Sequence, residues 1–232
     1  MKFAHSRISQ HMASPNRGAL EAVVHCVRYL ARTRHFCLHQ LYGEEDLWSF
    51  SSDSDQSGNV EIVNKSRNQL GHLGMRGRAP IIFGSKACST KFEVARSNWD
   101  ALLNPTCHPK MKELHADVSS AAAEIYAASV ALSEILYLSY ITEEMGMKFE
   151  LPITLLIDNS TCIAFSRNTV KRSKLRHIDC RMDWVKALRD EKLVRLEKVD
   201  TKENISDVFT KILDAAVFEK FRDRMLVECR IP

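Results

Sequence analysis

The 232-residue sequence lacks a long apolar segment. No uninterrupted apolar run approaches the ~18 residues that a bilayer-spanning helix requires. The opening residues, Met1–His11, also lack the apolar core of a secretory signal. Neither a membrane protein nor a secreted protein is expected. The sequence predicts an intracellular protein with no membrane partner.

Cysteine occurs seven times, but in no arrangement typical of a disulfide framework or a zinc site. The number is odd and the positions are scattered, which favours reduced thiols. There is no Cys-x-x-Cys pair, and Cys107 with His108 forms a single neighbouring pair in a polar, proline-flanked stretch. This pattern argues against zinc.

Glycine-rich phosphate loops, internal repeats and low-complexity tracts are also missing. The lack of a phosphate loop disfavours a nucleotide-binding protein, so no small-molecule cofactor is expected. The composition is ordinary for a globular domain, with 45% hydrophobic and 27% charged residues. A net charge of +4 permits an anionic partner without requiring one. The length suits one domain with an appendage.

Periodicity predicts an N-terminal helix and then a run of strands. Apolar residues recur at helical spacing over Gly18–Arg32. From Leu47 the pattern changes to short runs separated by turn residues, which favours an antiparallel meander. The predicted strands lie at Leu47–Asp55, 60–63 after the Gly58-Asn59 turn, 71–75 and Ala79–Ser85.

The second half of the sequence predicts helices alternating with two further strands. Ser97–Lys112 contains two prolines and no sustained period, which indicates a long loop with at most one helical turn. Val118–Met145 is a long helix by period and composition. The remaining predicted elements are strands at 153–157 and 193–199 and helices at 159–167, 178–190 and 206–226. This order predicts an α/β fold with one mixed sheet covered by helices.

Carboxylates stand at several junctions between these elements. Asp158 directly follows the strand 153–157, where it either caps the next helix, as Asn159 or Ser160 could also do, or points into a ligand-binding crevice. Asp53 ends the first strand, where such an aspartate is more commonly a solvated turn residue. Glu124 lies among small residues of the long helix, where burial is costly without a partner; alternatively, it lies at an edge with its carboxylate in water.

Asp207 lies at the entry of the last predicted helix, where it can simply complement the helix dipole. Individually these acids are weak indications, but together they form an ordered set on elements that would meet at one sheet edge. Converging carboxylates repel one another unless a divalent ion compensates them. Oxygen ligands favour Mg²⁺ or Mn²⁺, and two such ions about 4 Å apart can support hydrolysis of a phosphodiester.

Five motifs then give the chain a family resemblance. These are SSDSDQSG, ADVSSAAAEIYAAS, LLIDNSTCIAFSRN, RSKLRHIDCRMDWV and KENISDVFTK. In order and spacing they resemble the ribonuclease H region of copia-type long-terminal-repeat retrotransposons. The segment Arg7–Leu38 resembles the piece that joins this region to the reverse transcriptase.

The resemblance implies a ribonuclease H-like fold: a five-stranded mixed sheet, its first three strands antiparallel, flanked by helices, with an N-terminal helical extension. Residues 1–40 would form the connection segment and residues 41–232 the ribonuclease H-like domain. The implied activity is hydrolysis of the RNA strand of RNA–DNA hybrids with two Mg²⁺ ions, for which Mn²⁺ can substitute. The implied metal-binding and catalytic acids are Asp53, Glu124, Asp158 and Asp207, with Asp55 as the local competitor of Asp53.

The implied partners are an RNA–DNA hybrid and the remainder of a reverse transcriptase polyprotein. The wide minor groove of a hybrid presents phosphates and 2′-hydroxyls, so cations, hydroxyls and amides are the expected contacts. The implied location is a cytoplasmic virus-like particle or the nucleus. The predicted nucleic-acid-binding residues are Ser54, Ser120, Asn159, Lys171, Arg172, Lys174, Arg176 and His177.

Two features depart from the family pattern. The Ser97–Lys112 stretch is longer than expected, and the loop 201–204 lacks the histidine that cellular ribonucleases H often carry before their fourth acid. Three hypotheses follow: an active metal-dependent nuclease, a catalytically inactive nucleic-acid-binding or structural remnant, and, last, an unrelated nucleotide-binding α/β protein.

Overall fold

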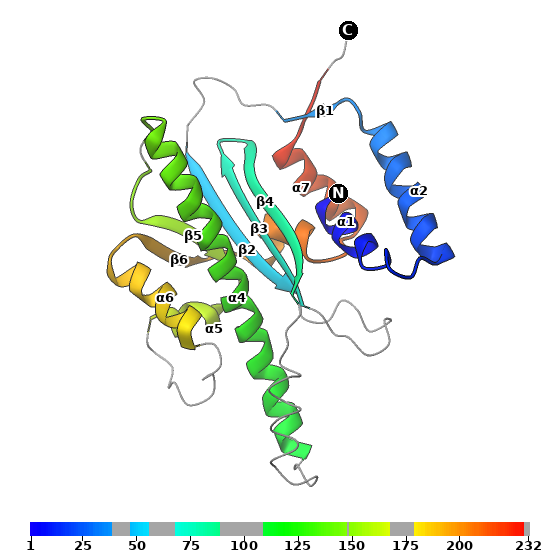
Figure 1. Ribbon diagram of the computed structural model, residues 1–232. Coiled ribbons are helices and arrows are strands. Elements are labelled where there is room, and N and C mark those ends of the chain that lie inside the picture. The colour runs from blue at the N-terminus through cyan, green and yellow to red at the C-terminus, as the bar shows by residue number, and fades with distance from the viewer. Residues whose placement is uncertain (39–46, 56–67, 89–108, 148, 168–178, 230–232) are drawn as a thin grey trace.

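The computed structural model describes residues 1–38, 47–55, 68–88, 109–147, 149–167 and 179–229 (Figure 1). At its centre is a five-stranded sheet with the strand order β4-β3-β2-β5-β6. Strands β2, β3 and β4 pair antiparallel, whereas β5 runs parallel to β2 and β6 parallel to β5. This confirms the predicted mixed sheet with its first three strands antiparallel. The strands are β2 (Trp48–Asp55), β3 (Asn68–Arg76), β4 (Ala79–Cys88), β5 (Ile153–Ile157) and β6 (Val194–Lys198).

One face of the sheet is covered by α4 (Pro109–Glu144), with α5 (Ser160–Ser166) and α6 (Asp179–Asp190) beside it (Figure 1). Apolar side chains of α4, among them Leu132, form one hydrophobic core with side chains of the sheet such as Leu155 of β5, and both leucines are fully buried. The helix begins at Pro109, earlier than predicted, because proline is well tolerated in a first helical turn.

The stretch Ala123–Glu144 of α4 is long and apolar enough to cross a membrane, with a mean hydropathy of 1.3 over its most apolar window. Length and composition alone do not distinguish such a span from the core helix of a globular domain. Here the buried side of this stretch forms the main hydrophobic core with the sheet. That packing accounts for the buried 44% of its most apolar window, whereas Tyr137 and Tyr140 of the same stretch are exposed.

The opposite face is covered by α1 (Lys2–Ser9), a short 3₁₀ helix η4 (Ile205–Phe209) and α7 (Ala215–Met225). Phe221 of α7 and Phe209 of η4 pack on the β3 side chains of this face to form a second, smaller core. A 3₁₀ turn, η3 (Thr201–Glu203), precedes η4. Elements from the start and from the end of the chain therefore lie on this same face of the sheet.

The single final helix predicted over 206–226 is wrong, because the chain forms η4, then an irregular segment, then α7. The predicted period is broken at Thr210 and Lys211, whose side chains turn back to Asp53 of β2. Asp214 is the N-cap residue of α7, from which the helix starts afresh. A tertiary contact has here overridden a helical sequence pattern.

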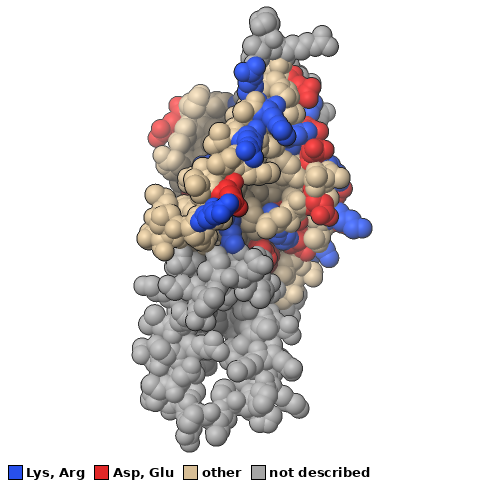
Figure 2. Space-filling model, turned by 90° about the vertical axis from the view of Figure 1, so that its right-hand side faces the viewer, with Lys and Arg blue, Asp and Glu red and all other residues tan. Residues whose placement is uncertain are grey.

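The N-terminal helix is close to the prediction, since α2 spans Arg17–Arg32. Asn16 is its N-cap residue, and the Asn16 side chain accepts a hydrogen bond from the Ala19 N–H. Its apolar stripe is unexpectedly exposed: Leu20 is 64% and Val27 59% accessible. Figure 2 views this side of the molecule, where Lys and Arg side chains are interspersed with Asp and Glu among other residues.

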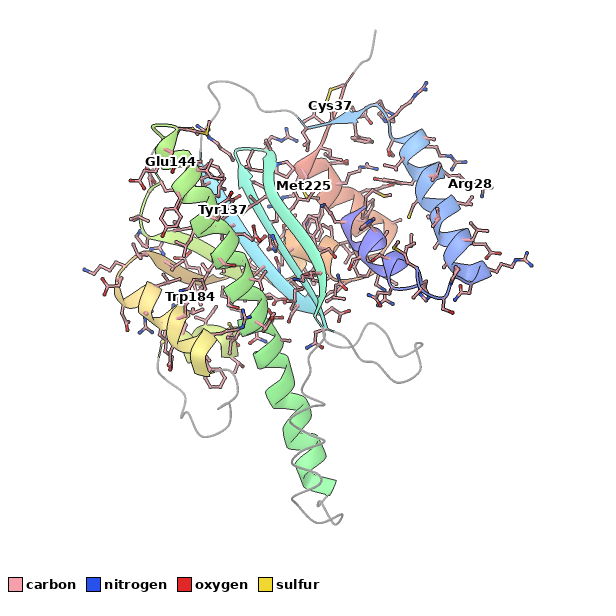
Figure 3. All side chains as sticks on the ribbon, viewed as in Figure 1. Arg28, Cys37, Tyr137, Glu144, Trp184 and Met225 are labelled. Carbon is pink, nitrogen blue, oxygen red and sulfur yellow. A yellow bond between two sulfur atoms is a disulfide. The ribbon has the colours of Figure 1, made fainter. Side chains whose placement is uncertain are left out.

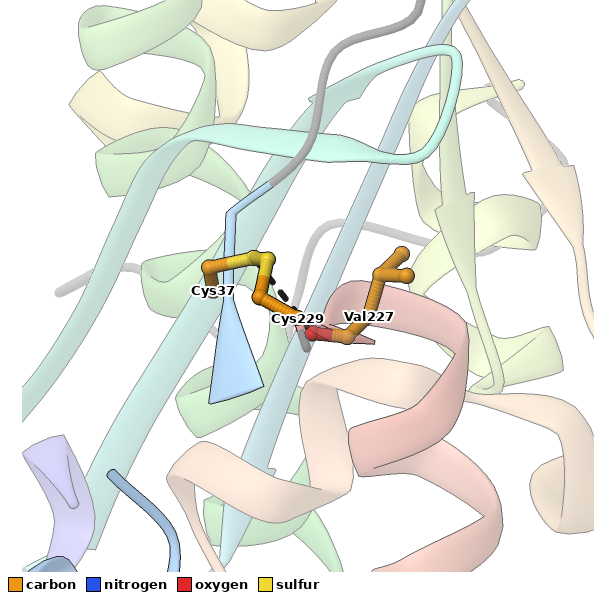
Figure 4. Close-up of a disulfide and its surroundings, with 3 residues drawn as sticks. All are labelled: Cys37, Val227 and Cys229. Atoms are coloured by element: carbon orange, nitrogen blue, oxygen red, sulfur yellow. Dashed lines mark hydrogen bonds between the residues drawn. A yellow bond between two sulfur atoms is a disulfide. The ribbon is translucent and has the colours of Figure 1, made fainter. Parts of the chain in front are cut away.

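Two short strands, β1 (Phe36–Cys37) and β7 (Val227–Glu228), pair antiparallel outside the main sheet. They place Cys37 beside Cys229, and the two form a disulfide with Cα atoms 6.1 Å apart (Figure 4). The expectation of reduced thiols is wrong for this pair, because a pairing across 192 residues leaves no local sequence signal. Among the described cysteines, Cys26 and Cys162 are free.

The other strands and helices confirm the predicted elements to within a few residues at their ends. Several predictions lie outside the described residues: the Gly58-Asn59 turn, the strand at 60–63, most of the Ser97–Lys112 stretch and the basic run 171–177.

Candidate metal centre

The centre of the site is Asp53, near the end of the central strand β2. Strands β2 and β5 are parallel neighbours in which Ser52 is level with Ile157, so Asp53 and Asp158 follow at the same edge. Side chains at the carboxyl ends of parallel strands point into one crevice. Asp53 is almost completely buried, at 1% exposure.

At this junction the sequence leaves two roles open, capping of the next helix and pointing into a crevice, and Asn159 and Asp158 each take one of them. The Asn159 side-chain oxygen accepts hydrogen bonds from the N–H groups of Thr161 and Cys162, at 2.9 and 3.0 Å. Asn159 is thus the N-cap of α5. The Asp158 carboxylate is not needed for capping and faces the other acids.

Glu124 approaches the same place from α4. It is 5% exposed and flanked by buried alanines, Ala123, Ala127 and Ala128, which let the helix lie close to the sheet. Its Oε1 accepts a hydrogen bond from the Ser54 N–H at 3.3 Å, whereas its buried Oε2 has no hydrogen-bond partner among the described residues. Burial first, and then the negative charge of Asp53, raise the pKa of Glu124 to about 8.

Carboxylate oxygens of Asp53, Glu124 and Asp158 lie within 4.8 Å of one another. Burial also raises the pKa of Asp53, and Asp158 adds to this effect by like-charge repulsion. Without a cation, the negative charges of Asp53 and Asp158 oppose the ionisation of Glu124. Asp55, further along the same strand, is not a member of this group.

Asp207 lies beside this group but is separated from it by a lysine. It lies on η4, which Asn204 orients by accepting the Ser206 N–H and donating to the Ser52 carbonyl oxygen. The Lys211 ammonium lies 3.1 Å from Asp207 Oδ1 and 3.3 Å from Asp53 Oδ1. Burial, followed by repulsion from Asp53, raises the pKa of Asp207 to about 7.

Two residues at the site, Thr210 and Lys211, did not emerge from the sequence patterns. The Thr210 hydroxyl donates to Asp53 Oδ2, while Lys211 contacts the other oxygen of the same carboxylate. Their spacing of three and four residues after Asp207 was the available signal, because such neighbours share a helix face. Because a continuous helix was predicted here, contacts of these two side chains with Asp53 were not expected.

The predicted nucleic-acid-binding residues are only partly described. Ser54 lies next to Asp53, and its backbone N–H holds Glu124. Ser120 lies on α4 one turn before Glu124, but its side chain is outside the described part of the chain, as are Lys171, Arg172, Lys174, Arg176 and His177. Their role stays a prediction.

The arrangement fits a divalent cation bound by oxygen atoms. Three carboxylates converge, and one of them presents a buried oxygen without a partner. Such an oxygen is costly unless a proton or a cation compensates it. Hard oxygen ligands favour a hard divalent ion over a soft metal.

Comparison with known proteins gives relatives over nearly the whole chain, although no family model matches it. The Pol polyprotein of transposon TNT 1-94 from Nicotiana tabacum is 24% identical over 91% of this chain. That of transposon RE1 from Arabidopsis thaliana is 23% identical over 100% of it. The chain spans only 14% of the length of either relative.

Similar solved structures are ribonucleases H. The LC11 ribonuclease H1 in complex with an RNA/DNA hybrid has 9% identity and a TM-score of 0.43, covering 71% of this chain and 94% of that one. The N-terminal ribonuclease H domain of Rv2228c from Mycobacterium tuberculosis has 10% identity and a TM-score of 0.43, covering 76% and 96%.

The sheet order and strand directions agree with the ribonuclease H-like arrangement that the sequence resemblance implied. The polyprotein relatives extend along the same residues that carry the motifs. Together they confirm the recognition: the homologues of this chain are Pol polyproteins of plant copia-type retrotransposons, and its fold is ribonuclease H-like.

Proposed function

We propose that this chain is a metal-dependent endonuclease that hydrolyses the RNA strand of RNA–DNA hybrids during retrotransposon reverse transcription. The observation that carries the proposal is the convergence of Asp53, Glu124 and Asp158 within 4.8 Å, from two strand ends and a helix. An intracellular location, in a virus-like particle or the nucleus, and a larger Pol polyprotein as partner belong to the same proposal.

In this function Asp53, Glu124 and Asp158 hold a divalent ion through their oxygens. Bound there, Mg²⁺ or Mn²⁺ would activate water and stabilise the charge that develops on the phosphodiester. The chain itself fixes the ligand geometry. Thr210 and Lys211 orient Asp53, the Ser54 N–H orients Glu124, and capping by Asn159 leaves Asp158 available.

The hybrid would lie across the open edge where these acids meet. Ser54 adjoins Asp53, and the basic run Lys171–Arg176 follows α5 in the sequence. Hydroxyls, amides and cations are the groups that recognise phosphates and 2′-hydroxyls in the minor groove of a hybrid. Binding of this kind is shape-selective and independent of base sequence.

Cleavage of a labelled RNA–DNA hybrid in Mg²⁺ or Mn²⁺ tests the proposal. We expect RNA-strand cleavage by the native chain and at least a ~100-fold lower rate for Asp158→Asn, because the metal contribution to such a reaction is several kcal/mol. Asp190→Asn is the matched control, since Asp190 is exposed at the end of α6 and, within the described part of the chain, pairs with its neighbour Arg189.

A catalytically inactive nucleic-acid-binding remnant would give a different result. It would bind the hybrid without cleaving it in either metal, and Asp158→Asn would change nothing. Cleavage by the native chain at the same rate as by Asp158→Asn would point to a contaminating nuclease and would contradict the proposal.

A further inference from the structure

Lys211 places a fixed positive charge between two of the predicted metal ligands. Its ammonium lies 3.3 Å from Asp53 Oδ1 and 3.1 Å from Asp207 Oδ1. The two carboxylates are 1% and 9% exposed and the lysine side chain 30%. This ion pair is largely shielded from water, so its charges act on one another more strongly than surface charges would.

The position of Lys211 is fixed by the backbone. Its N–H donates to the Asp207 carbonyl oxygen at 2.9 Å, which closes a helical turn. The preceding residue, Thr210, is completely buried and donates its hydroxyl to Asp53. The lysine therefore extends from a held segment and reaches both carboxylates from one side.

The two sides of Asp53 are thus different environments. On the side of Glu124 and Asp158 the described residues present carboxylate oxygens, and one of these, Glu124 Oε2, is buried without a hydrogen-bond partner. This is the environment of a cation site. On the side of Asp207, one oxygen of Asp53 and one of Asp207 already contact the Lys211 ammonium group. A divalent ion there would meet a like charge at close range.

We propose that Lys211 is a tethered cation that takes the place of a second divalent ion between Asp53 and Asp207. The centre then binds one divalent ion tightly, at Asp53, Glu124 and Asp158, and a second ion only weakly. Lys211 is a positioning residue that acts through Asp53 and Asp207. This inference rests on the proposed function and replaces the two ions that the sequence resemblance implied with one ion and one lysine.

The number of Mn²⁺ ions bound by the full chain tests the proposal without any substitution. Titration calorimetry, or electron paramagnetic resonance of free Mn²⁺, is expected to show one tight ion per chain. Lys211→Met should add a second ion with at least a tenfold gain in affinity, whereas Lys211→Arg keeps the positive charge and should bind one ion as the native chain does.

A second variant covers the case in which Lys211→Met does not fold, as judged by circular dichroism. Asp207→Asn should leave the single tight ion unchanged, because Asp207 is not one of its ligands. If Asp207→Asn instead removed one of two ions, the proposal would be overturned.

The two possible failures are distinguishable. Two equally tight ions in the native chain, together with cleavage of the hybrid, would overturn the role of Lys211 and leave the proposed function standing. No Mn²⁺ binding by the native chain would overturn both. Equal stoichiometry in the native chain and a folded Lys211→Met would also overturn the role of Lys211.

Discussion

Glu124 buries a carboxylate whose ionisation the folded chain opposes when no cation is present. Burial and the charge of Asp53 raise its pKa from 4.5 to about 8. Between pH 4.5 and about pH 8, Glu124 is protonated in the folded protein but ionised in the unfolded chain. Unfolding in this window therefore releases a proton, and the free energy of unfolding of the metal-free protein must fall as pH rises.

We predict that Glu124→Gln removes this pH dependence. In the native chain with a chelator present, Glu124 contributes a slope of up to about 1.4 kcal/mol per pH unit between pH ~4.5 and ~8. Glutamine cannot titrate, so the variant should be more stable than the native chain above about pH 8. Urea unfolding with a chelator, from about pH 6 to about pH 9, measures both effects.

Glu144→Gln provides the control, because Glu144 lies on the same helix but is exposed. It should keep the slope of the native chain. The raised pKa of Asp207 and that of Asp53 leave some slope in Glu124→Gln. An unchanged slope in that variant would contradict the assignment of the proton to Glu124.

At the residue scale, the acids were predictable and their neighbours were not. Asp53 and Asp158 each end a strand with a clear period, so their convergence follows from sheet geometry. Glu124 was indicated by the small residues around it. Lys211 and Thr210 belong to a segment that reads as the middle of a helix, and only contacts across more than 150 residues reveal their direction.

At the scale of elements, the approach of η4 to the sheet decides whether Asp207 and Lys211 reach Asp53. The approach requires glycine at position 71 of β3, level with Asp53. A Cβ there would lie 2.7 Å from a Thr210 side-chain carbon, 2.8 Å from Phe209 Cβ and 3.1 Å from the Ser206 carbonyl oxygen. These distances are shorter than van der Waals contact, so a side chain would push η4 outward.

We predict that Gly71→Ala destabilises the chain by about 1–3 kcal/mol, the usual cost of overpacking a closely packed site. It should also change Mn²⁺ binding, because Thr210 and Lys211 would no longer hold Asp53. Urea unfolding and Mn²⁺ titration measure the two effects.

Gly18→Ala is the control for this substitution. Position 18 lies in the first turn of α2, and a Cβ there would lie 3.5 Å from the Asn16 side-chain oxygen, an ordinary contact. Its effect should be below about 1 kcal/mol. A Gly71→Ala variant as stable as the native chain would show that η4 is not held by close packing on β3.

The elements that the sequence predicted correctly share a strong local period. The strands β2, β5 and β6 and the helices α2, α5 and α6 each follow their pattern to within a few residues. The final helix was wrong because Thr210 and Lys211 make tertiary contacts that the helical pattern cannot express. The apolar stripe of α2 is exposed, and its sequence pattern could not predict this. Periodicity predicts that a helix has an apolar face, but not what covers that face.

At the scale of the whole molecule, the first and last segments of the chain are joined. Arg28 of α2 and Cys37 of β1 lie on the same side of the molecule as Met225 at the end of α7 (Figure 3). Tyr29 of α2 meets Phe218 of α7 edge to face, with ring centroids 5.9 Å apart. We propose that residues 1–40 form a connection segment that docks on the domain formed by residues 41–232 in this way.

The disulfide between Cys37 and Cys229 adds a covalent link to this docking. A cross-link over 192 residues restricts the unfolded chain more than the folded one. In the intracellular location that we propose for this chain, most thiols are reduced. The non-covalent contacts must then hold the segment in place: the β1–β7 pairing, the Tyr29–Phe218 contact and the Arg222 guanidinium over the Phe36 ring at 4.4 Å.

We predict that reduction lowers the stability of the native chain without unfolding it. Loss of the cross-link should cost about 2–5 kcal/mol, as for other native disulfides. Cys229→Ser should match the reduced native chain with or without reductant, whereas Cys26→Ser, which removes a free thiol, should keep the response of the native chain. Calorimetric melting with and without dithiothreitol measures the difference. Equal melting temperatures for the oxidised and reduced native chain would show that the β1–β7 contacts, rather than the covalent link, carry the stability of this junction.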